Sequence, residues 1–400
     1  MWSDNETSED FLNFTAVANT AAEMIVSANG QPLSIGISGS WGVGKSSMIK
    51  LVRRSLEEQS GDKFVFIEFN AWLYQGYDDA RAALMDVIAS RLIERAKGNQ
   101  KALDKAKKFL GRVNWVRGVG VVGGLAASAA SHGLLPPGVV AEGINAITGF
   151  WSGKRDKETL DHLKHAAGEA EKAGKDVMEK AHGLLKPEEG PPSPPDQIHE
   201  LRRYFEETLE ALDVTLVVLI DDLDRCLPNT TIATLEAIRL FLFLKHTAFI
   251  IAADEKMIRQ AVRRHFHDFQ MDEDLVTNYF DKLIQVPILV PPLGIQEVRA
   301  YMMLLYIERS NLEKDKREEL RAAVCKQLSE TWQGKRVDRT FIREKLPDCE
   351  PDLADKLALA DRLAPFMAGA KQIAGNPRLI KRFLNTLSIR LSIAAAQNVQ

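Results

Sequence analysis

The sequence predicts an α/β fold in which a parallel sheet is flanked by helices, and three observations support this. Short apolar runs suited to strands alternate with segments of helical period. Two of the runs, 215–220 and 247–253, are almost continuously apolar, as expected where helices cover both faces of a parallel sheet. Polar or turn-forming residues follow each run, so the chain can reverse there.

The first hundred residues supply two strands and two helices of this pattern. Ser34 to Ser38 is a short apolar strand, and a helix is expected to begin near Lys45. Residues 64–69 are rich in aromatic and β-branched side chains and predict a second strand. Residues 80–97 have a helical period.

The alternation resumes in the second half of the chain. Strands are expected over 215–220, 247–253 and 283–290, and helices over 198–212, 232–244 and 255–266. From Ile295 onward only helical patterns occur, which predicts a C-terminal helical domain.

Residues 98–196 interrupt the pattern and are interpreted as a helical insertion. Residues 98–112 are basic and amphipathic, 118–141 lack charge and are rich in Gly and Ala, and 187–196 form a Pro-rich linker. Two interpretations of residues 113–151 remain open: a membrane hairpin, or a glycine-rich hairpin that packs on protein. Each arm reaches the length of a membrane span, but Glu142 and the many small residues weaken the membrane interpretation.

Composition excludes several classes of protein. The net charge of −3 gives no global basic field, so nucleic acid is not indicated as a partner. The three cysteines show no paired spacing, which favours a reducing cytoplasmic compartment. The acidic first residues lack the apolar core of a secretory signal.

Residues Gly39 to Ser46, here called the phosphate loop, match the pattern G-x-x-x-x-G-K-S between a predicted strand and a predicted helix. The glycines let backbone N–H groups surround a phosphate, and the helix adds its positive end. Lys45 is expected to reach the β- and γ-phosphates, and the Ser46 hydroxyl to hold Mg²⁺. The residues predicted to bind the nucleotide are Gly39, Ser40, Trp41, Gly42, Val43, Gly44, Lys45, Ser46 and Ser47.

Asp221 and Asp222 follow the buried strand over 215–220. Neighbouring buried carboxylates repel, and a bound Mg²⁺ relieves that repulsion. We therefore assign Asp221 to the metal and Asp222 to the catalytic base that orients water. The alternative is an acidic turn that pairs with Arg225.

Other polar residues are secondary candidates. Asp254 either senses the γ-phosphate or caps the next helix. Arg378, four residues before Arg382 on a basic helix, is assigned to the nucleotide phosphates, the alternative being a solvated basic face. The chain has no Asn-Lys-x-Asp segment to read a guanine edge, so ATP is favoured over GTP.

Together these segments resemble the KAP family of P-loop NTPases, within the broader ATPase division that includes AAA+ and STAND proteins. The matching segments are Gly39–Ser46, Phe69-Asn70-Ala71-Trp72, Asp221–Cys226, Lys282–Pro287 and Gly375–Arg382. The resemblance implies an ATPase, often with two membrane helices inserted between the phosphate loop and the acidic strand. It also implies a bacterial setting in phage exclusion or defence.

The predicted organisation has four parts. Residues 1–97 and 197–292 are the two halves of a P-loop NTPase sheet, 98–196 the insertion, and 293–400 a helical lid. The favoured function is an ATP-hydrolysing switch or remodeller that uses Mg²⁺ and acts on proteins encoded nearby, with a homo-oligomer as one form. The alternatives are a nucleotide-dependent scaffold with little hydrolysis, and a membrane-anchored exclusion or transport ATPase attached through residues 113–151.

Overall fold

The computed structural model describes residues 1–74, 80–113, 194–265 and 282–397. The chain divides into two compact units. The first comprises Met1–Leu84 and Asp213–Gln400, and the second Met85–Leu212.

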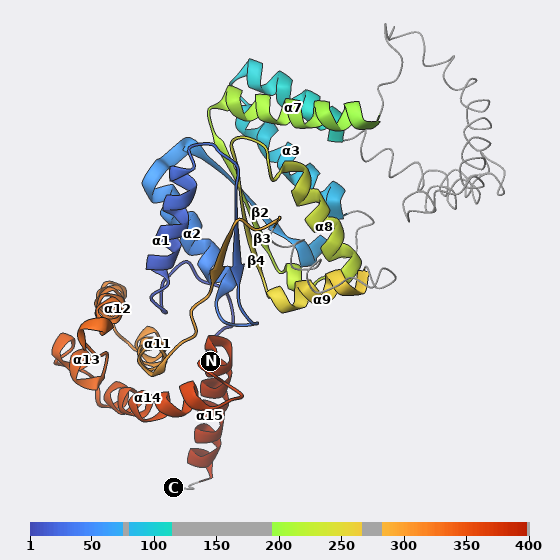
Figure 1. Ribbon diagram of the computed structural model, residues 1–400. Helices are drawn as coiled ribbons and strands as arrows, with labels where there is room; N and C mark the ends of the chain where they lie inside the picture. The colour runs from blue at the N-terminus through green and yellow to red at the C-terminus, as the bar shows by residue number, and fades with distance from the viewer. Residues whose placement is uncertain (75–79, 114–193, 266–281, 398–400) are drawn as a thin grey trace, which may run out of the picture. The chain divides into compact units, whose positions relative to one another are not determined.

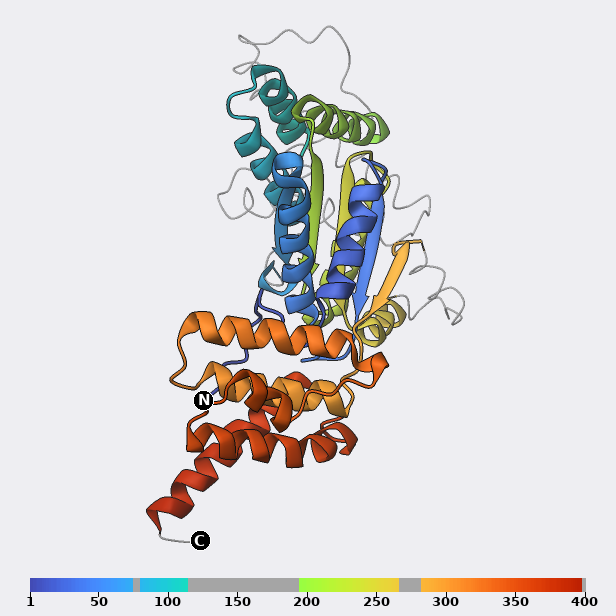
Figure 2. The same ribbon diagram turned by 90° about the vertical axis from the view of Figure 1, so that its left-hand side faces the viewer.

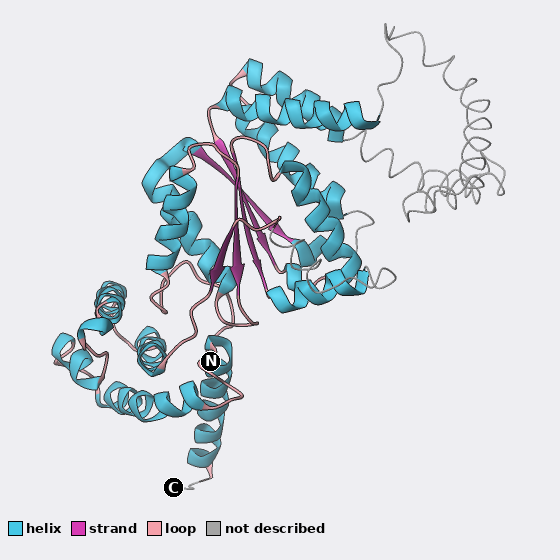
Figure 3. Cartoon of the chain, in the orientation of Figure 1, coloured by secondary structure: helices cyan, strands magenta, loops and turns pink. Residues whose placement is uncertain are grey.

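The first unit is built on a five-stranded parallel sheet with the order β2-β3-β4-β1-β5. The strands are β1 (Leu33–Ser38), β2 (Phe64–Asn70), β3 (Thr215–Asp221), β4 (Thr247–Ala253) and β5 (Val286–Leu289). The predicted parallel α/β fold is therefore confirmed (Figure 3). Ser38 pairs with Ala253, and Ile220 with Ile251, so the loops after β1 and β3 leave the same edge of the sheet.

Strand β5 is shorter than the run over 283–290 that predicted it. Among the described strands it pairs with β1 alone, and its residues alternate between half-buried and exposed. Pro287 lies within it and has no N–H for a second neighbour, which suits an edge position.

Helices α1 (Thr15–Ser27) and α2 (Lys45–Ser60) cover one face of the sheet, and α8 (Pro228–Phe241) and α9 (Glu255–His265) the other (Figure 1). Helix α1 is not among the predicted elements. Helix α8 begins four residues before the predicted position 232, because Pro228 occupies its first turn, where a missing N–H costs nothing. Helix α9 follows the predicted helix over 255–266 as far as His265, and residue 266 lies outside the described residues.

The C-terminal region is helical, as predicted, and shares the core of the sheet. Its helices are α11 (Ile295–Glu308), α12 (Lys314–Ser329), α13 (Arg339–Lys345), α14 (Pro351–Gly369) and α15 (Pro377–Ala396). Val217 of β3, Ile250 of β4 and Val298 of α11 belong to one buried apolar cluster. Figure 2 shows these helices gathered beneath the sheet, so they lie at the edge where the phosphate loop leaves β1.

The second unit contains most of α3 (Ala80–Ala96), a helix over 100–113 and α7 (Pro194–Leu212). Its small core includes Phe109 and Phe205, whose ring centroids are 5.4 Å apart. Helix α7 begins inside the predicted linker 187–196, because proline is tolerated in a first helical turn.

The predicted hairpin over 113–151 lies outside the described residues except for Val113. Among the residues that are described, no helix is long and apolar enough to cross a membrane.

Candidate functional site

The phosphate loop curls because two of its glycines adopt left-handed backbone angles. Gly42 has φ 81° and Gly44 φ 106°, conformations that strain residues carrying a Cβ. Gly44 is also the residue from which α2 begins. The N-terminus of α2 therefore opens toward the loop and supplies positive potential for an anion.

Lys45 points back into the loop and is almost fully buried. Its Nζ donates to the carbonyl oxygen of Gly39 at 2.9 Å and that of Ser40 at 3.4 Å. It also lies 3.2 Å from Asp224 Oδ2, whose side chain is 2% exposed. The same carboxylate oxygen accepts from the Trp41 indole at 3.1 Å, so Asp224 holds both the lysine and the tip of the loop.

Asp221 faces Ser46 at the end of β3. The backbone N–H of Asp222 donates to the Asp221 carboxylate at 2.8 Å, and the nearby Ser46 hydroxyl favours the charged form of that carboxylate. Burial raises the pKa of the Asp221 carboxyl, while the hydrogen bonds and the charge of Lys45 oppose that rise. This is a half-buried acid beside a hydroxyl, both hard oxygen donors of the kind that Mg²⁺ prefers.

Asp222 adopts a left-handed conformation, φ 56°, which aspartate tolerates better than most residues. Its Oδ2 accepts from Asn70 Nδ2 at 2.9 Å, and its Oδ1 pairs with Arg225 Nε at 2.8 Å. Arg225 also lies over the Trp72 ring, 5.8 Å from its centroid. Both oxygens of the predicted base are thus oriented by neighbours.

Helix α15 begins directly against the phosphate loop. Asn376 caps the helix with its Oδ1, and its Nδ2 donates to the carbonyl oxygen of Trp41 at 2.7 Å. The backbone N–H of Arg378 donates to the carbonyl oxygen of Gly42 at 3.3 Å. A Cβ added at Gly42 would lie 2.5 Å from Arg378 Cβ, so the loop needs a glycine here to let the helix approach.

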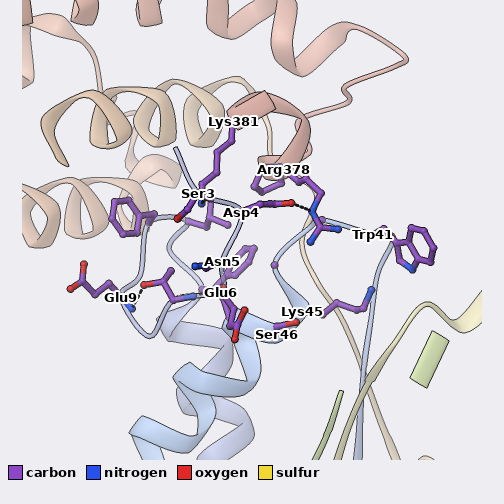
Figure 4. A pocket seen from close by; sticks show the side chains of 18 of the residues that line it. Ser3, Asp4, Asn5, Glu6, Glu9, Trp41, Lys45, Ser46, Arg378 and Lys381 are labelled. Atoms are coloured by element: carbon purple, nitrogen blue, oxygen red, sulfur yellow. Dashed lines mark hydrogen bonds and ion pairs between the residues drawn. The ribbon is translucent and has the colours of Figure 1, made fainter. Parts of the chain in front are cut away.

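A cavity of about 590 Å³, a size that suits a nucleotide, is lined by most of the predicted residues but not by Gly39, Ser40 or Val43. Lys45, Ser46, Asp221, Asp222 and Arg378 line it, as do residues 2–7 of the N-terminal segment. Figure 4 shows the phosphate loop, the start of α15 and this segment surrounding the same space.

The secondary candidate Asp254 adjoins the site without lining the cavity, since its N–H donates to Asp224 Oδ2 at 2.8 Å. Arg382 does not line this cavity, whereas Lys381 does and donates to the carbonyl oxygen of Ser3 at 3.0 Å. Burial lowers the pKa of Lys381. The Asp254 carboxylate accepts from Lys256 N at 3.0 Å in the first turn of α9, which is the geometry of a cap.

Sequence reasoning left three contributors to the site without a role: Asn70, Asp224 and Asn376. Asn70 is the last residue of β2, and Asn376 precedes a proline that starts a helix, so position alone could have indicated them. Asp224 reads from sequence only as part of an acidic turn. Its contact with Lys45, 179 residues earlier in the chain, depends on the sheet order.

The family model described as the KAP family P-loop domain matches residues 14–394, nearly the whole chain. The search of curated proteins finds no match.

Proposed function

Because the chain belongs to the KAP family of P-loop NTPase domains, we propose that it binds ATP with Mg²⁺ at the phosphate loop and hydrolyses it. The observation that carries the proposal is the convergence of Lys45, Ser46, Asp221 and Asp222 on one cavity at the carboxyl edge of the sheet. Lys45 and the N-terminus of α2 would neutralise the phosphates, and Arg378 would reach them from α15.

The proposed metal position is Ser46 with Asp221. Two oxygen donors suit Mg²⁺, which usually takes its remaining ligands from substrate phosphates and water. Within the described ranges, no group of three or more His, Cys, Asp or Glu side chains could hold a metal. An ion here would therefore depend on the nucleotide, and when bound it would neutralise charge on the phosphates.

Asp222 is the proposed general base. It would accept a proton from the water that attacks the γ-phosphorus, with ADP and phosphate as products. An aspartate reaches one methylene less far than a glutamate, and both of its oxygens are already engaged by Asn70 and Arg225. Slow basal turnover is therefore expected.

Two substitutions test the site. Lys45→Ala should abolish ATP binding, whereas Asp222→Asn should bind ATP and lose turnover, as measured by nucleotide titration and phosphate release. The matched controls are Lys63→Ala, which lies outside the cavity, and Asp213→Asn, which has a similar φ of 54° but precedes β3. Unchanged turnover in both test variants would refute the assignment.

The proposed biological role is a switch or remodeller in bacterial defence against phage, and the family resemblance is its support. ATP would act on the C-terminal helices through α15, whose first residues bond to the phosphate loop. In a phage-infection assay, cells expressing the chain with its neighbouring genes should be protected. Cells carrying Lys45→Ala should not, and equal survival would argue against the role.

A nucleotide-dependent scaffold is the second candidate. The contacts of Asp222 with Asn70 and Arg225 favour it, because they engage both oxygens of the proposed base. Steady-state ATPase measurements with and without the neighbouring proteins separate the two: a scaffold binds ATP and releases almost no phosphate in either condition. A membrane-anchored ATPase is the third, and carbonate-washed membrane fractions of the full chain test it.

A further inference from the structure

The N-terminal segment over residues 2–10, here called the strap, runs along the proposed nucleotide cavity. Trp2 anchors its start. The indole Nε1 donates to the carbonyl oxygen of Leu305 on α11 at 2.9 Å, and the backbone N–H donates to Asn385 Oδ1 on α15 at 2.7 Å. The strap is thus fastened to the C-terminal helices at one end.

Further along, the strap meets α2, the helix that starts at the phosphate loop. The Thr7 N–H donates to Ser47 Oγ at 3.2 Å, and the Glu6 carboxylate pairs with Lys50 Nζ at 3.1 Å. Ser47 is in the first turn of α2 and is among the residues predicted to bind nucleotide. The strap therefore spans from α15 to the phosphate-binding helix.

Between these two attachments lies Asp4, which pairs with Arg378. Asp4 Oδ2 is 2.6 Å from Arg378 Nε, and Figure 4 shows the two side chains meeting at the cavity. The Nε atom is buried, and no partner among the described residues accepts a hydrogen bond from it. The contact is therefore an ion pair that leaves hydrogen-bonding capacity of Arg378 unused.

We propose that the strap is an autoinhibitory contact, in which Asp4 occupies the arginine that the triphosphate would otherwise reach. A carboxylate and a phosphate oxygen compete for one guanidinium, and their like charges disfavour binding together. The proposal rests on the proposed function, because it requires ATP at the phosphate loop with Arg378 on its terminal phosphate. ADP is shorter by that phosphate, so it leaves Asp4 on Arg378.

The consequence is a strap that responds to the γ-phosphate. When Asp4 leaves Arg378, the strap loses that ion pair but keeps Trp2 on the C-terminal helices, Ser3 on Lys381 and Glu6 on α2. The start of α15 stays on the loop through Asn376. ATP would therefore loosen the strap without detaching the helix.

The test compares ATP and ADP affinities of the full chain with those of Asp4→Asn. The variant should bind ATP about two- to fivefold more tightly, the range that loss of a partly exposed ion pair implies, and ADP as before. In an Arg378→Ala background, Asp4→Asn should have no further effect. The control is Glu9→Gln, which removes a strap ion pair to Arg321 at 3.4 Å but no contact with Arg378.

Hydrogen–deuterium exchange of residues 2–10 gives a second readout: faster exchange with ATP, not with ADP, and no response to ATP in Arg378→Ala. Unchanged or weaker ATP binding by Asp4→Asn, or an equal gain in affinity from Glu9→Gln, would contradict the autoinhibitory role of the strap. Neither result would contradict ATP binding by the parent chain. If the parent binds no ATP, the proposed function fails, and the strap falls with it.

Discussion

The phosphate loop and the acidic turn over Asp221–Cys226 leave the same edge of the sheet, yet they are organised differently. The loop takes its path from its own glycines and the helix it opens. The acidic turn takes its arrangement from Asn70, Trp41 and Lys45, which lie far away in the sequence. A local motif therefore indicates the shape of the first region, and only assembly of the sheet determines the second.

The largest expected loss of stability comes from a substitution in the acidic turn. Asp224→Ala removes a carboxylate whose side chain is 2% exposed and leaves the Lys45 ammonium without its ion-pair partner. We expect the free energy of unfolding to fall by about 3 kcal/mol, because breaking a buried pair leaves an uncompensated charge. Urea unfolding of the nucleotide-free chain measures it.

The control for this variant is Asp352→Ala, which breaks an exposed pair with Lys356 within α14. Its cost should stay below about 0.5 kcal/mol. If both variants lower the free energy of unfolding equally, the long-range contact of Asp224 adds no stability beyond that of a surface ion pair. The acidic turn would then not depend on long-range contacts in the way the comparison with the phosphate loop requires.

The next effect concerns the loop. Gly42→Ala should destabilise the chain by about 1 to 3 kcal/mol more than Gly334→Ala does. Both glycines have φ near 80°, but a Cβ at Gly42 would meet Arg378 and Asn376, whereas nothing lies within 4 Å of one at Gly334. Only Gly42→Ala should also weaken ATP binding. Equal losses of stability would mean that backbone angle alone sets the loop and that the approach of α15 is immaterial.

A smaller effect sharpens the comparison where the loop meets α15. Asn376→Ala and Asp338→Ala each remove a helix cap, so each should cost about 1 kcal/mol of stability. Only Asn376 also bonds to the loop, at Trp41. ATP affinity measured by calorimetry should therefore fall in Asn376→Ala alone; a matching fall in Asp338→Ala would show that general loosening is responsible.

The smallest effect reports on the acidic turn without altering it. Burial is the main cause that raises the pKa of Cys226 from 9.0 to about 12, followed by the charges of Asp222 and Asp224. Since the thiolate is the reactive form, a chain keeping only Cys226 should label about a thousandfold more slowly at pH 8 when folded than when unfolded. Its labelling rate should keep rising with pH above 9, whereas that of the unfolded chain levels off.

The same thiol contributes to the pH dependence of stability. Its folded pKa lies above the unfolded one, so its contribution is present below pH 9 and is lost as the pH rises toward 12. A folded-state labelling rate that levels off near pH 9 would mean that the acidic turn is open to solvent.

The central strands were predictable because residues buried on both faces of a sheet form continuous apolar runs in the sequence. Residues 215–220 and 247–253 are nearly continuous apolar runs, and each lies within an observed strand. The strand predicted over 283–290 was longer than the observed β5, because its apolar pattern resembles that of a central strand. Only Pro287 indicates an edge position. Helix α1 went unpredicted although its buried residues, Ala18, Ala22 and Ile25, have helical spacing, because small alanines give a weak apolar signal.

By itself, the sequence determined the parallel α/β class, the phosphate loop and the family, because glycine spacing and apolar periodicity are local properties. Only the tertiary structure decided that Asp224, rather than either preceding acid, pairs with Lys45, and that Asp4 lies on Arg378. These contacts join residues 179 and 374 positions apart in the chain. They follow from strand order and helix docking, which local patterns do not specify.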